Sequence, residues 1–143
     1  MTSVTPIATA RLVVDTDVAS FIFKWHPKLA PAYVSLLRGA ELVISFMTLA
    51  EIREGATNAN WGPRRLEVLE DYLAEFAVLH SDSLLCSKWA AVRNESARRG
   101  RPISSADAWI AATALVLSVP LVTNNPRDYR HLDNLQIITV DTN

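Results

Sequence analysis

The feature that most constrains the fold is a short apolar run, Leu12-Val13-Val14, which ends abruptly in Asp15 and Asp17. A run of this kind, bounded by polar segments, is typical of a strand buried in a parallel sheet. In open α/β sheets, ligands bind just beyond the carboxyl ends of the strands, where the chain turns back into a helix. Asp15 is therefore predicted to stand at a ligand-binding edge of the sheet.

The rest of the chain alternates apolar runs of strand length with segments of helical periodicity. This alternation predicts an α/β sandwich, in which a mainly parallel sheet carries helices on both faces. Further strands are expected over 41–46, 77–80, 120–123 and 135–140. Helices are expected over 18–25, 31–38, 48–56, 64–76, from a cap at 82 to the break at 100, over 105–116, and as a short turn near 127–131.

Two of these helix starts carry an acid three residues after a Thr or Ser, as Thr48–Glu51 and Ser104–Asp107. An acid at this position stabilises a helix by closing a capping box and by meeting the helix dipole, so both acids have a structural explanation beside a functional one. Asp107 also shares a helix face with Ile110, on the side directed at the core. A carboxylate directed there needs a partner.

Length and composition predict a single globular domain over residues 11–143, preceded by a loose tail over 1–10. The formal net charge of −1 excludes a global basic field, so any binding of nucleic acid must be local. Cys86 is the lone cysteine, which excludes an intramolecular disulfide. No signal peptide or membrane-spanning stretch is apparent, and a cytoplasmic protein is expected.

Acids follow or open these elements at separate places in the chain, and a parallel sheet would bring them to one edge. Asp15 ends the first strand, Glu51 and Asp107 lie one turn into their helices, and Asp128 follows the strand at 120–123. Converging carboxylates without a cation would repel one another and raise at least one pKa. Mg²⁺ or Mn²⁺ takes oxygen ligands of this kind, so a metal site is predicted.

Other functional patterns are weaker. His26, His80 and His131 have no metal-ligand spacing, which argues against zinc, and Cys86 has no evident base nearby. The tract that contains Arg98, Arg99 and Arg101 has two explanations. It is either a solvated helix end or a local site for the phosphates of a nucleic acid.

Four motifs stand in order along the chain and together resemble one known family. They are Val13-Val14-Asp15-Thr16-Asp17, Glu51-Ile52-Arg53-Glu54-Gly55, Ser105-Ala106-Asp107-Ala108-Trp109-Ile110-Ala111-Ala112-Thr113-Ala114 and Leu121-Val122-Thr123-Asn124-Asn125-Pro126-Arg127-Asp128-Tyr129. In this order and spacing they resemble the PIN domain, and more narrowly the VapC-type ribonuclease toxins of bacterial toxin–antitoxin pairs. The resemblance covers the chain from about residue 11 to 140.

The resemblance implies a compact three-layer α/β/α sandwich that dimerises, binds Mg²⁺ or Mn²⁺ and cuts RNA as an endonuclease, with transfer RNA a candidate substrate. It also implies a small antitoxin protein that wraps the toxin and blocks its site. Asp15 and Asp107 match the family's principal metal-binding acids, and Glu51 matches the acid of its E-x-x-x-G motif.

The last motif departs from the family pattern. The family often carries an aspartate two residues after the threonine that is Thr123 here, and this chain has Asn125 instead. The number of bound cations, one or two, therefore stays open. Asp128 matches the acid of the following aspartate–aromatic pair, and Thr123 and Asn125 are expected to supply oxygen atoms or orient water. Asp17 is expected either to support the site or to cap the next helix.

Two other functions remain open. A phosphatase of the haloacid dehalogenase type would use Asp15 as nucleophile and Asp17 as acid, but it also needs a lysine before a late helix. The lysines here, Lys24, Lys28 and Lys88, are not placed for that role. A PIN-like module that binds RNA or protein without cutting is favoured by Asn125. The presence of all three principal acids argues against it.

Overall fold

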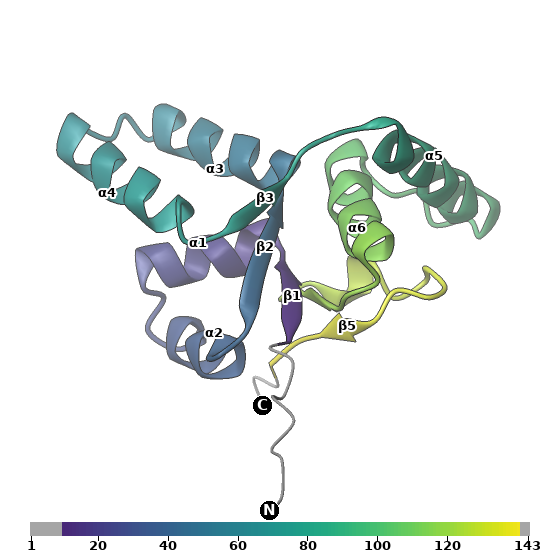
Figure 1. The fold of residues 1–143 in the computed structure, drawn as a ribbon, viewed down its shortest axis with the longest axis horizontal. Helices are drawn as coiled ribbons and strands as arrows, with labels where there is room; N and C mark the ends of the chain where they lie inside the picture. Colours follow the sequence, from purple (N-terminus) through teal and green to yellow (C-terminus); the bar gives the residue numbers. More distant parts are fainter. Residues whose placement is uncertain (1–9, 141–143) are drawn as a thin grey trace, which may run out of the picture.

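A computed structural model describes residues 10–140 of the chain. The strands are β1 (Arg11–Val14), β2 (Glu41–Ser45), β3 (Ala77–Leu79), β4 (Leu121–Val122) and β5 (Ile137–Ile138). The helices are α1 (Thr16–Lys24), α2 (Leu29–Leu37), α3 (Phe46–Asn58), α4 (Pro63–Leu73), α5 (Ser83–Arg98), α6 (Ser105–Leu117) and the 3-10 helix η1 (Pro126–Asp128). The strands form one parallel sheet in the order β3-β2-β1-β4-β5 (Figure 1).

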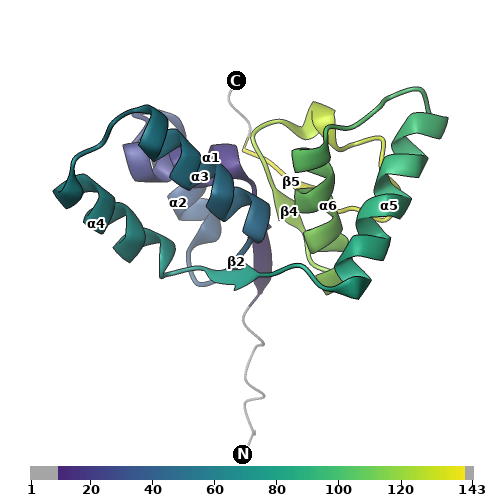
Figure 2. The same ribbon diagram turned by 90° about the horizontal axis from the view of Figure 1, so that it is seen from above.

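The sheet is the middle layer of three, because alternate side chains of each strand enter different cores. On one face Leu12 and Val14 of β1 pack among α1, α2, α3 and α4. On the other face Val13 packs against α5 and α6. Figure 2 shows α1 to α4 on one side of the sheet and α5 and α6 on the other. The predicted α/β/α sandwich with a parallel sheet is confirmed.

The strand order reverses at β1, and this reversal places the ligand-binding edge. From β1 the chain adds β2 and β3 on one side, whereas β4 and β5 lie on the other. A crevice opens at such a switch point, beyond the carboxyl ends of the two strands that flank it. Here those ends are Asp15 after β1 and Thr123 after β4. The backbone N–H of Asp15 donates to the carbonyl of Val122 at 2.9 Å, which joins the two tips.

Several helix boundaries differ from the prediction, and the helix expected over 64–76 spans Pro63–Leu73. The helix expected over 18–25 begins at Thr16, because Asp15 itself is the cap, and it ends before Trp25, whose φ of 53° is left-handed. The helix expected over 31–38 spans Leu29–Leu37.

The helix expected over 48–56 begins two residues early, at Phe46. Its cap is Ser45, whose hydroxyl accepts from the N–H of Met47 at 3.0 Å. The predicted capping box between Thr48 and Glu51 is therefore wrong, since both residues lie inside the helix. The predicted end at residue 56 is also wrong, because the helix runs on to Asn58.

Two predicted caps are confirmed. Asp82 accepts from the N–H of Leu85 at 2.8 Å and starts α5, and Ser104 accepts from the N–H of Asp107 at 3.1 Å and starts α6. Residues 1–9 of the predicted tail lie outside the described residues. Ala10 is tied to the sheet, because its carbonyl accepts from the N–H of Glu41 at 2.7 Å.

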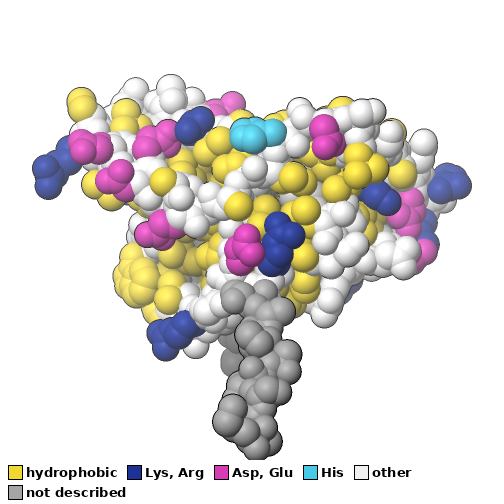
Figure 3. Space-filling model, viewed as in Figure 1, with side chains coloured by type: hydrophobic (Ala, Val, Ile, Leu, Met, Phe, Trp, Pro, Cys, Tyr) yellow, Lys and Arg dark blue, Asp and Glu magenta, His cyan; other side chains and the backbone are white. Residues whose placement is uncertain are grey.

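Charged side chains are mixed on the surface. Figure 3 shows basic and acidic groups interspersed on one face of the molecule, with no continuous basic patch on it. No helix within residues 10–140 combines the length and the apolar character that crossing a membrane requires.

Candidate active site

Asp15 is fixed at the junction of β1 and β4. Only 6 % of its surface is exposed, although it carries a carboxylate. One carboxylate oxygen, Oδ1, accepts from the N–H of Thr16 at 2.8 Å, and the other, Oδ2, accepts from the hydroxyl of Thr123 at 2.7 Å. The side chain therefore has one orientation, at the edge where the strand order reverses.

Asp107 lies in the first turn of α6, in the helical layer formed by α5 and α6. The hydroxyl of Tyr129 donates to its Oδ1 at 3.2 Å. Tyr129 is buried, and burial together with the charges of Asp15 and Asp107 raises its pKa, so the hydroxyl keeps its proton. The core-facing carboxylate predicted from the sequence thus has the partner that it needs.

The acids at this edge raise one another's pKa values. Burial is the main cause for Asp15, whose pKa is raised from 3.8 to about 7, and the charges of Asp17 and Asp107 add to it. Burial likewise raises the pKa of Asp107, and the charge of Asp128 adds to it. Burial and the charges of Asp107 and Asp128 also raise the pKa of Asp17. These carboxylates are therefore close enough to destabilise one another when all are ionised.

Glu51 lies in the second turn of α3 and reaches the site through a threonine. The hydroxyl of Thr16 donates to Glu51 Oε1 at 2.8 Å and lies 2.9 Å from the hydroxyl of Thr48, which is buried. Since Thr16 directly follows Asp15, this bond holds Glu51 beside the first acid. Nothing in the spacing of Glu51 within its own motif indicates this contact.

Asp17 and Asn125 shape the loop after β4. Asp17 accepts from the N–H of Val18 at 2.7 Å and from the N–H of Asn124 at 3.2 Å, so it joins α1 to this loop. The N–H of Asn125 donates to the Thr123 hydroxyl at 3.0 Å, while the Asn125 side chain is exposed. Asp17 therefore both supports the loop and contributes charge to the site.

The donor set fits a hard divalent cation, because it consists of carboxylate and hydroxyl oxygens whose negative charges oppose one another. Among residues 10–140, however, no three His, Cys, Asp or Glu side chains are already arranged as a metal-ligand group. The Tyr129 hydroxyl donates to Asp107, and the charges of both Asp15 and Asp107 act on its pKa, whereas Glu51 is held through Thr16. Asp15 and Asp107 are therefore the carboxylates expected to coordinate a cation first.

The family model of the PIN domain matches residues 12–135. This chain belongs to the PIN domain family. Among the family's relatives of known name, it is 31 % identical over 125 residues to Ribonuclease VapC1 of Haemophilus influenzae strain R2866, covering 87 % of this chain and 93 % of that one. It is also 30 % identical over 126 residues to the tRNA(fMet)-specific endonuclease VapC of Shigella flexneri, covering 88 % and 95 %.

A solved structure agrees with these sequence matches. A member of the VapBC family of toxin–antitoxin systems, VapBC-5 from Mycobacterium tuberculosis, superposes with a TM-score of 0.69 at 30 % identity, covering 92 % of this chain and 99 % of that one. The resemblance found in the four sequence motifs is thereby confirmed. Membership of the PIN domain family also removes the haloacid dehalogenase alternative.

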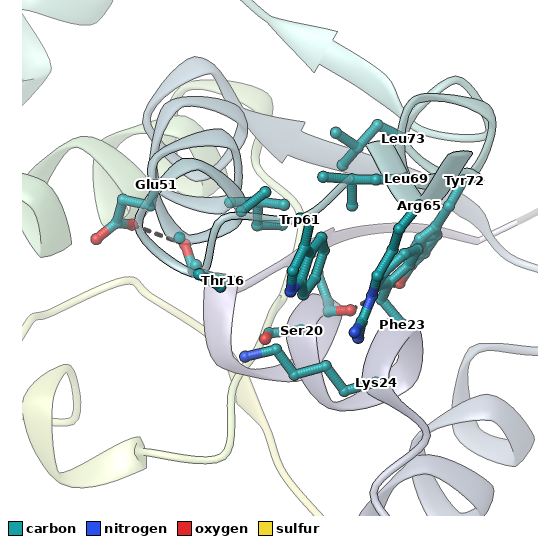
Figure 4. A pocket seen from close by; sticks show the side chains of 15 residues that line it. Thr16, Ser20, Phe23, Lys24, Glu51, Trp61, Arg65, Leu69, Tyr72 and Leu73 are labelled. Carbon is teal, nitrogen blue, oxygen red and sulfur yellow. Dashed lines mark hydrogen bonds between the residues drawn. The ribbon is translucent and has the colours of Figure 1, made fainter. Parts of the chain in front are cut away.

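Two cavities of this PIN domain border on the acids. The first, called the aromatic cavity below, measures about 270 Å³ and lies among α1, α3 and α4. Figure 4 shows Thr16 and Glu51 at one end of it and Trp61, Phe23, Tyr72 and Arg65 at the other. Phe23 stacks on both Trp61 and Tyr72, with ring centroids 5.5 and 5.4 Å apart, so its wall is mostly apolar.

The second, called the arginine cavity below, measures about 300 Å³ and is polar. It lies between the loop before α6 and the segment that contains η1. Its lining includes Arg101, Ser104, Asp107, Arg127, Asp128 and His131.

The arginines predicted to bind nucleic acid have different surroundings. Arg99 forms ion pairs with Glu95, at 3.3 Å, and with Asp133. Arg98 is exposed and lies outside the arginine cavity, whereas Arg101 lines it. The tract is therefore partly a helix end held by its neighbours and partly the wall of a cavity beside Asp107.

Two residues in this PIN domain were not predicted to take part in the site. Thr16 positions Glu51, and Tyr129 binds Asp107. Thr16 stands directly after a strand-ending acid, and Tyr129 stands in the last motif. Those positions are the signals available in the sequence, but neither reveals which distant side chain the hydroxyl contacts.

Proposed function

We propose that this PIN domain is a metal-dependent endoribonuclease that hydrolyses RNA phosphodiester bonds as the toxin of a toxin–antitoxin pair. The observation that carries the proposal is the buried Asp15 at the β1–β4 switch point, close enough to Asp107 on α6 for the charge of Asp107 to act on it. The names of the relatives support RNA as the substrate class, and one of them supports transfer RNA as the first substrate to test.

Asp15 and Asp107 would hold Mg²⁺ or Mn²⁺, with Thr123 keeping Asp15 in position. When bound, such a cation lowers the pKa of a coordinated water and offsets the charge that develops on the phosphoryl oxygens. Glu51 orients the attacking water by accepting its hydrogen bond, and Thr16 fixes the carboxylate of Glu51 for that purpose. Tyr129 keeps Asp107 directed at the same point.

The remaining acids and amides act less directly in this proposal. Asp17 holds the loop after β4 through the N–H of Asn124. Asn125 offers a neutral amide oxygen where the family often has an acid, and Asp128 supplies negative charge nearby, as its effect on the pKa of Asp107 indicates. This arrangement favours a first cation at Asp15 and Asp107, with any second one held more weakly.

The partner in this proposal is a small antitoxin protein, supported by the toxin–antitoxin description of a solved relative. An antitoxin segment that covers the aromatic cavity would reach Glu51 and Thr16, since both line that cavity. We also propose that the protein acts as a homodimer and in the cytoplasm. The lone, exposed Cys86 is compatible with a reducing compartment.

A mixed pool of transfer RNA, incubated with the purified chain in Mg²⁺, in Mn²⁺ and in chelator, tests the proposal. We expect discrete fragments that disappear with chelator and with Asp107→Asn. The matched control is Asp71→Asn, which neutralises an exposed acid on α4. Cleavage that survives chelator or Asp107→Asn would contradict the metal-dependent mechanism.

Asn125 supports a second candidate function, a module that binds RNA without cutting it. The two functions differ in one measurement. A binding module retains the RNA pool in a gel-shift assay but produces no fragments with either cation. Intact pool with undiminished binding would therefore favour the module over the nuclease.

A further inference from the structure

The arginine cavity has cationic side chains from two separate segments. Arg101 comes from the loop that precedes α6, and Arg127 comes from η1. Asp107 lies in the same lining, so the cavity opens directly beside one of the two acids proposed to hold the cation. A group bound between the arginines would be adjacent to the reacting centre.

Neither arginine side chain is paired with another residue in the part of the chain that the structure describes. Within residues 10–140, Arg101 and Arg127 form no ion pair, and both are exposed. Arg99, two residues before Arg101, is paired with Glu95 and Asp133. The two cavity arginines therefore keep their hydrogen-bond donors for a ligand.

Both segments that carry them are anchored. On one side, Ile103 is buried and its carbonyl accepts from Arg93, while Ser104 caps α6. On the other side, the N–H of Arg130 donates to the carbonyl of Pro126 at 2.9 Å and closes the turn of η1. Because the backbone of both segments is already ordered, binding here adds no large cost of backbone ordering.

The positive charge of the cavity comes from Arg101 and Arg127. His131 also lines it, but its Nε2 is 2.8 Å from the hydroxyl of Ser96. Burial, and after it the charge of Arg101, lowers the pKa of His131, so the ring is neutral at neutral pH. Asp107 and Asp128 would repel an anion, and the two guanidinium groups are what offsets that repulsion.

A nucleic acid strand places one negative charge on every nucleotide, so a phosphate next to the scissile one must lie close to the acids. The aromatic cavity suits a base or an apolar side chain better, because stacked rings form its wall. A guanidinium group binds phosphate oxygens with charge-assisted hydrogen bonds, often in pairs. The arginine cavity is the one with the matching chemistry.

We propose that the arginine cavity is the subsite for the RNA phosphate that neighbours the scissile one, with Arg101 and Arg127 as its cationic contacts. This inference rests on the proposed ribonuclease function. It adds that the sugar–phosphate backbone of the RNA lies on the side of the site where the arginine cavity opens. The bases are then free to face the aromatic cavity or solvent. Arg101 and Arg127 act in substrate binding, so their loss raises KM more than it lowers kcat.

The first test measures binding of single-stranded RNA by the full chain at several salt concentrations. Arg101→Gln and Arg127→Gln should each weaken binding about tenfold and should lower the slope of log K against log salt by about 0.7. Arg98→Gln and Arg130→Gln are the matched controls, because both arginines are exposed and lie outside the cavity. Equal slopes for cavity and control variants would overturn the proposal.

The second test removes the charge from the RNA instead of the protein. Once the fragments of a cleaved RNA reveal the cut, the phosphate on each side of it is replaced in turn by a neutral methylphosphonate. For one of the two positions, the replacement should raise the KM of the unaltered chain at least about tenfold and should have no further effect in the double variant Arg101→Gln/Arg127→Gln. Independent, multiplicative losses at both positions in the double variant would exclude a contact between these arginines and either phosphate.

These tests separate the subsite from the function on which it rests. If the unaltered chain cuts no RNA, the proposed nuclease function fails, while the salt slopes still decide whether Arg101 and Arg127 bind a phosphate. If the chain cuts RNA and the cavity variants match their controls in KM and slope, the subsite fails and the nuclease function stands.

Discussion

The aromatic cavity and the arginine cavity border on the same acids but are built from different layers of the sandwich. The aromatic cavity lies among α1, α3 and α4 and is walled by the stack of Trp61, Phe23 and Tyr72. The arginine cavity lies beside α6 and η1 and has Arg101 and Arg127 in its lining. The two faces of the sheet thus offer a substrate different kinds of surface: apolar and aromatic on one side, and on the other polar, with two arginines beside two aspartates.

The acids connect these two surfaces. Thr16 and Glu51 line the aromatic cavity, whereas Asp107 and Asp128 line the arginine cavity. Asp15 adjoins both groups: it precedes Thr16 in the chain, and burial, with the charges of Asp17 and Asp107 in addition, raises its pKa. A polymer with a charged backbone and flat bases can contact both surfaces across one reacting centre, which a small symmetrical substrate cannot do.

If the acids between the cavities hold the reacting phosphate, neutralising either principal acid should abolish cleavage. We expect Asp15→Asn and Asp107→Asn each to lower kcat for RNA by more than about 1,000-fold, with unchanged circular dichroism. Asp71→Asn should leave kcat unaltered, because Asp71 is exposed on α4. Residual cleavage within tenfold of the unaltered chain would show that the centre lies elsewhere.

The repulsion among these acids should lower the free energy of unfolding when chelator keeps the site free of metal. The folded-state pKa of Asp15, about 7, lies above its ordinary value of 3.8, so the folded chain holds a proton that the unfolded chain has released. The free energy of unfolding should therefore fall as pH rises from about 4 to 7. Above that window Asp15→Asn should be more stable than the unaltered chain by on the order of 3 kcal/mol.

Urea unfolding at pH 5 and pH 8 checks this expectation. The advantage of Asp15→Asn should be larger at pH 8 than at pH 5, and Mg²⁺ should reduce it by stabilising only the unaltered chain. If the stability difference between Asp15→Asn and the unaltered chain does not change with pH, its cause is packing and not charge.

The link between Asp15 and the aromatic cavity can be tested at Glu51 and Thr16. Glu51→Gln should lower kcat about 100-fold, because the amide has one acceptor oxygen in place of two and carries no charge. Thr16→Val should lower kcat about tenfold, because Glu51 loses its hydrogen bond at 2.8 Å. Thr57→Val is the control for the second change, since the Thr57 hydroxyl bonds only within α3, to the carbonyl of Arg53. Equal kcat values for the two valine variants would dismiss Thr16 as a positioning residue.

The smallest effect is expected in the aromatic cavity itself. Arg65 stacks on Trp61, with its guanidinium carbon 3.8 Å from the ring centroid, so its charge is engaged on the ring. Arg65→Gln should change the KM for RNA by less than about twofold, in contrast to Arg127→Gln. A loss as large as that of Arg127→Gln would mean that the charged backbone also runs through the aromatic cavity.

The sequence predicted this fold to a large extent, for reasons visible in single elements. Leu12-Val13-Val14 is apolar on both faces and is buried on both, and the caps Asp82 and Ser104 start helices where predicted. The start of α3 was missed because Ser45 and Thr48 are both capable caps. Pairing of β2 with β1 and β3 ends the strand at Ser45, and Thr48 bonds to Thr16 in a different element.

The sequence by itself determined the candidate acids, since Asp15, Glu51 and Asp107 follow from local patterns of strand tip, helix start and motif. The tertiary structure decided how they are arranged: Asp15 against Thr123, Glu51 through Thr16, and Asp107 against Tyr129. It also decided which arginine faces the site. Local patterns arise from backbone preferences a few residues apart, whereas these contacts join segments that meet only when the parallel strands align and two helical layers close over them.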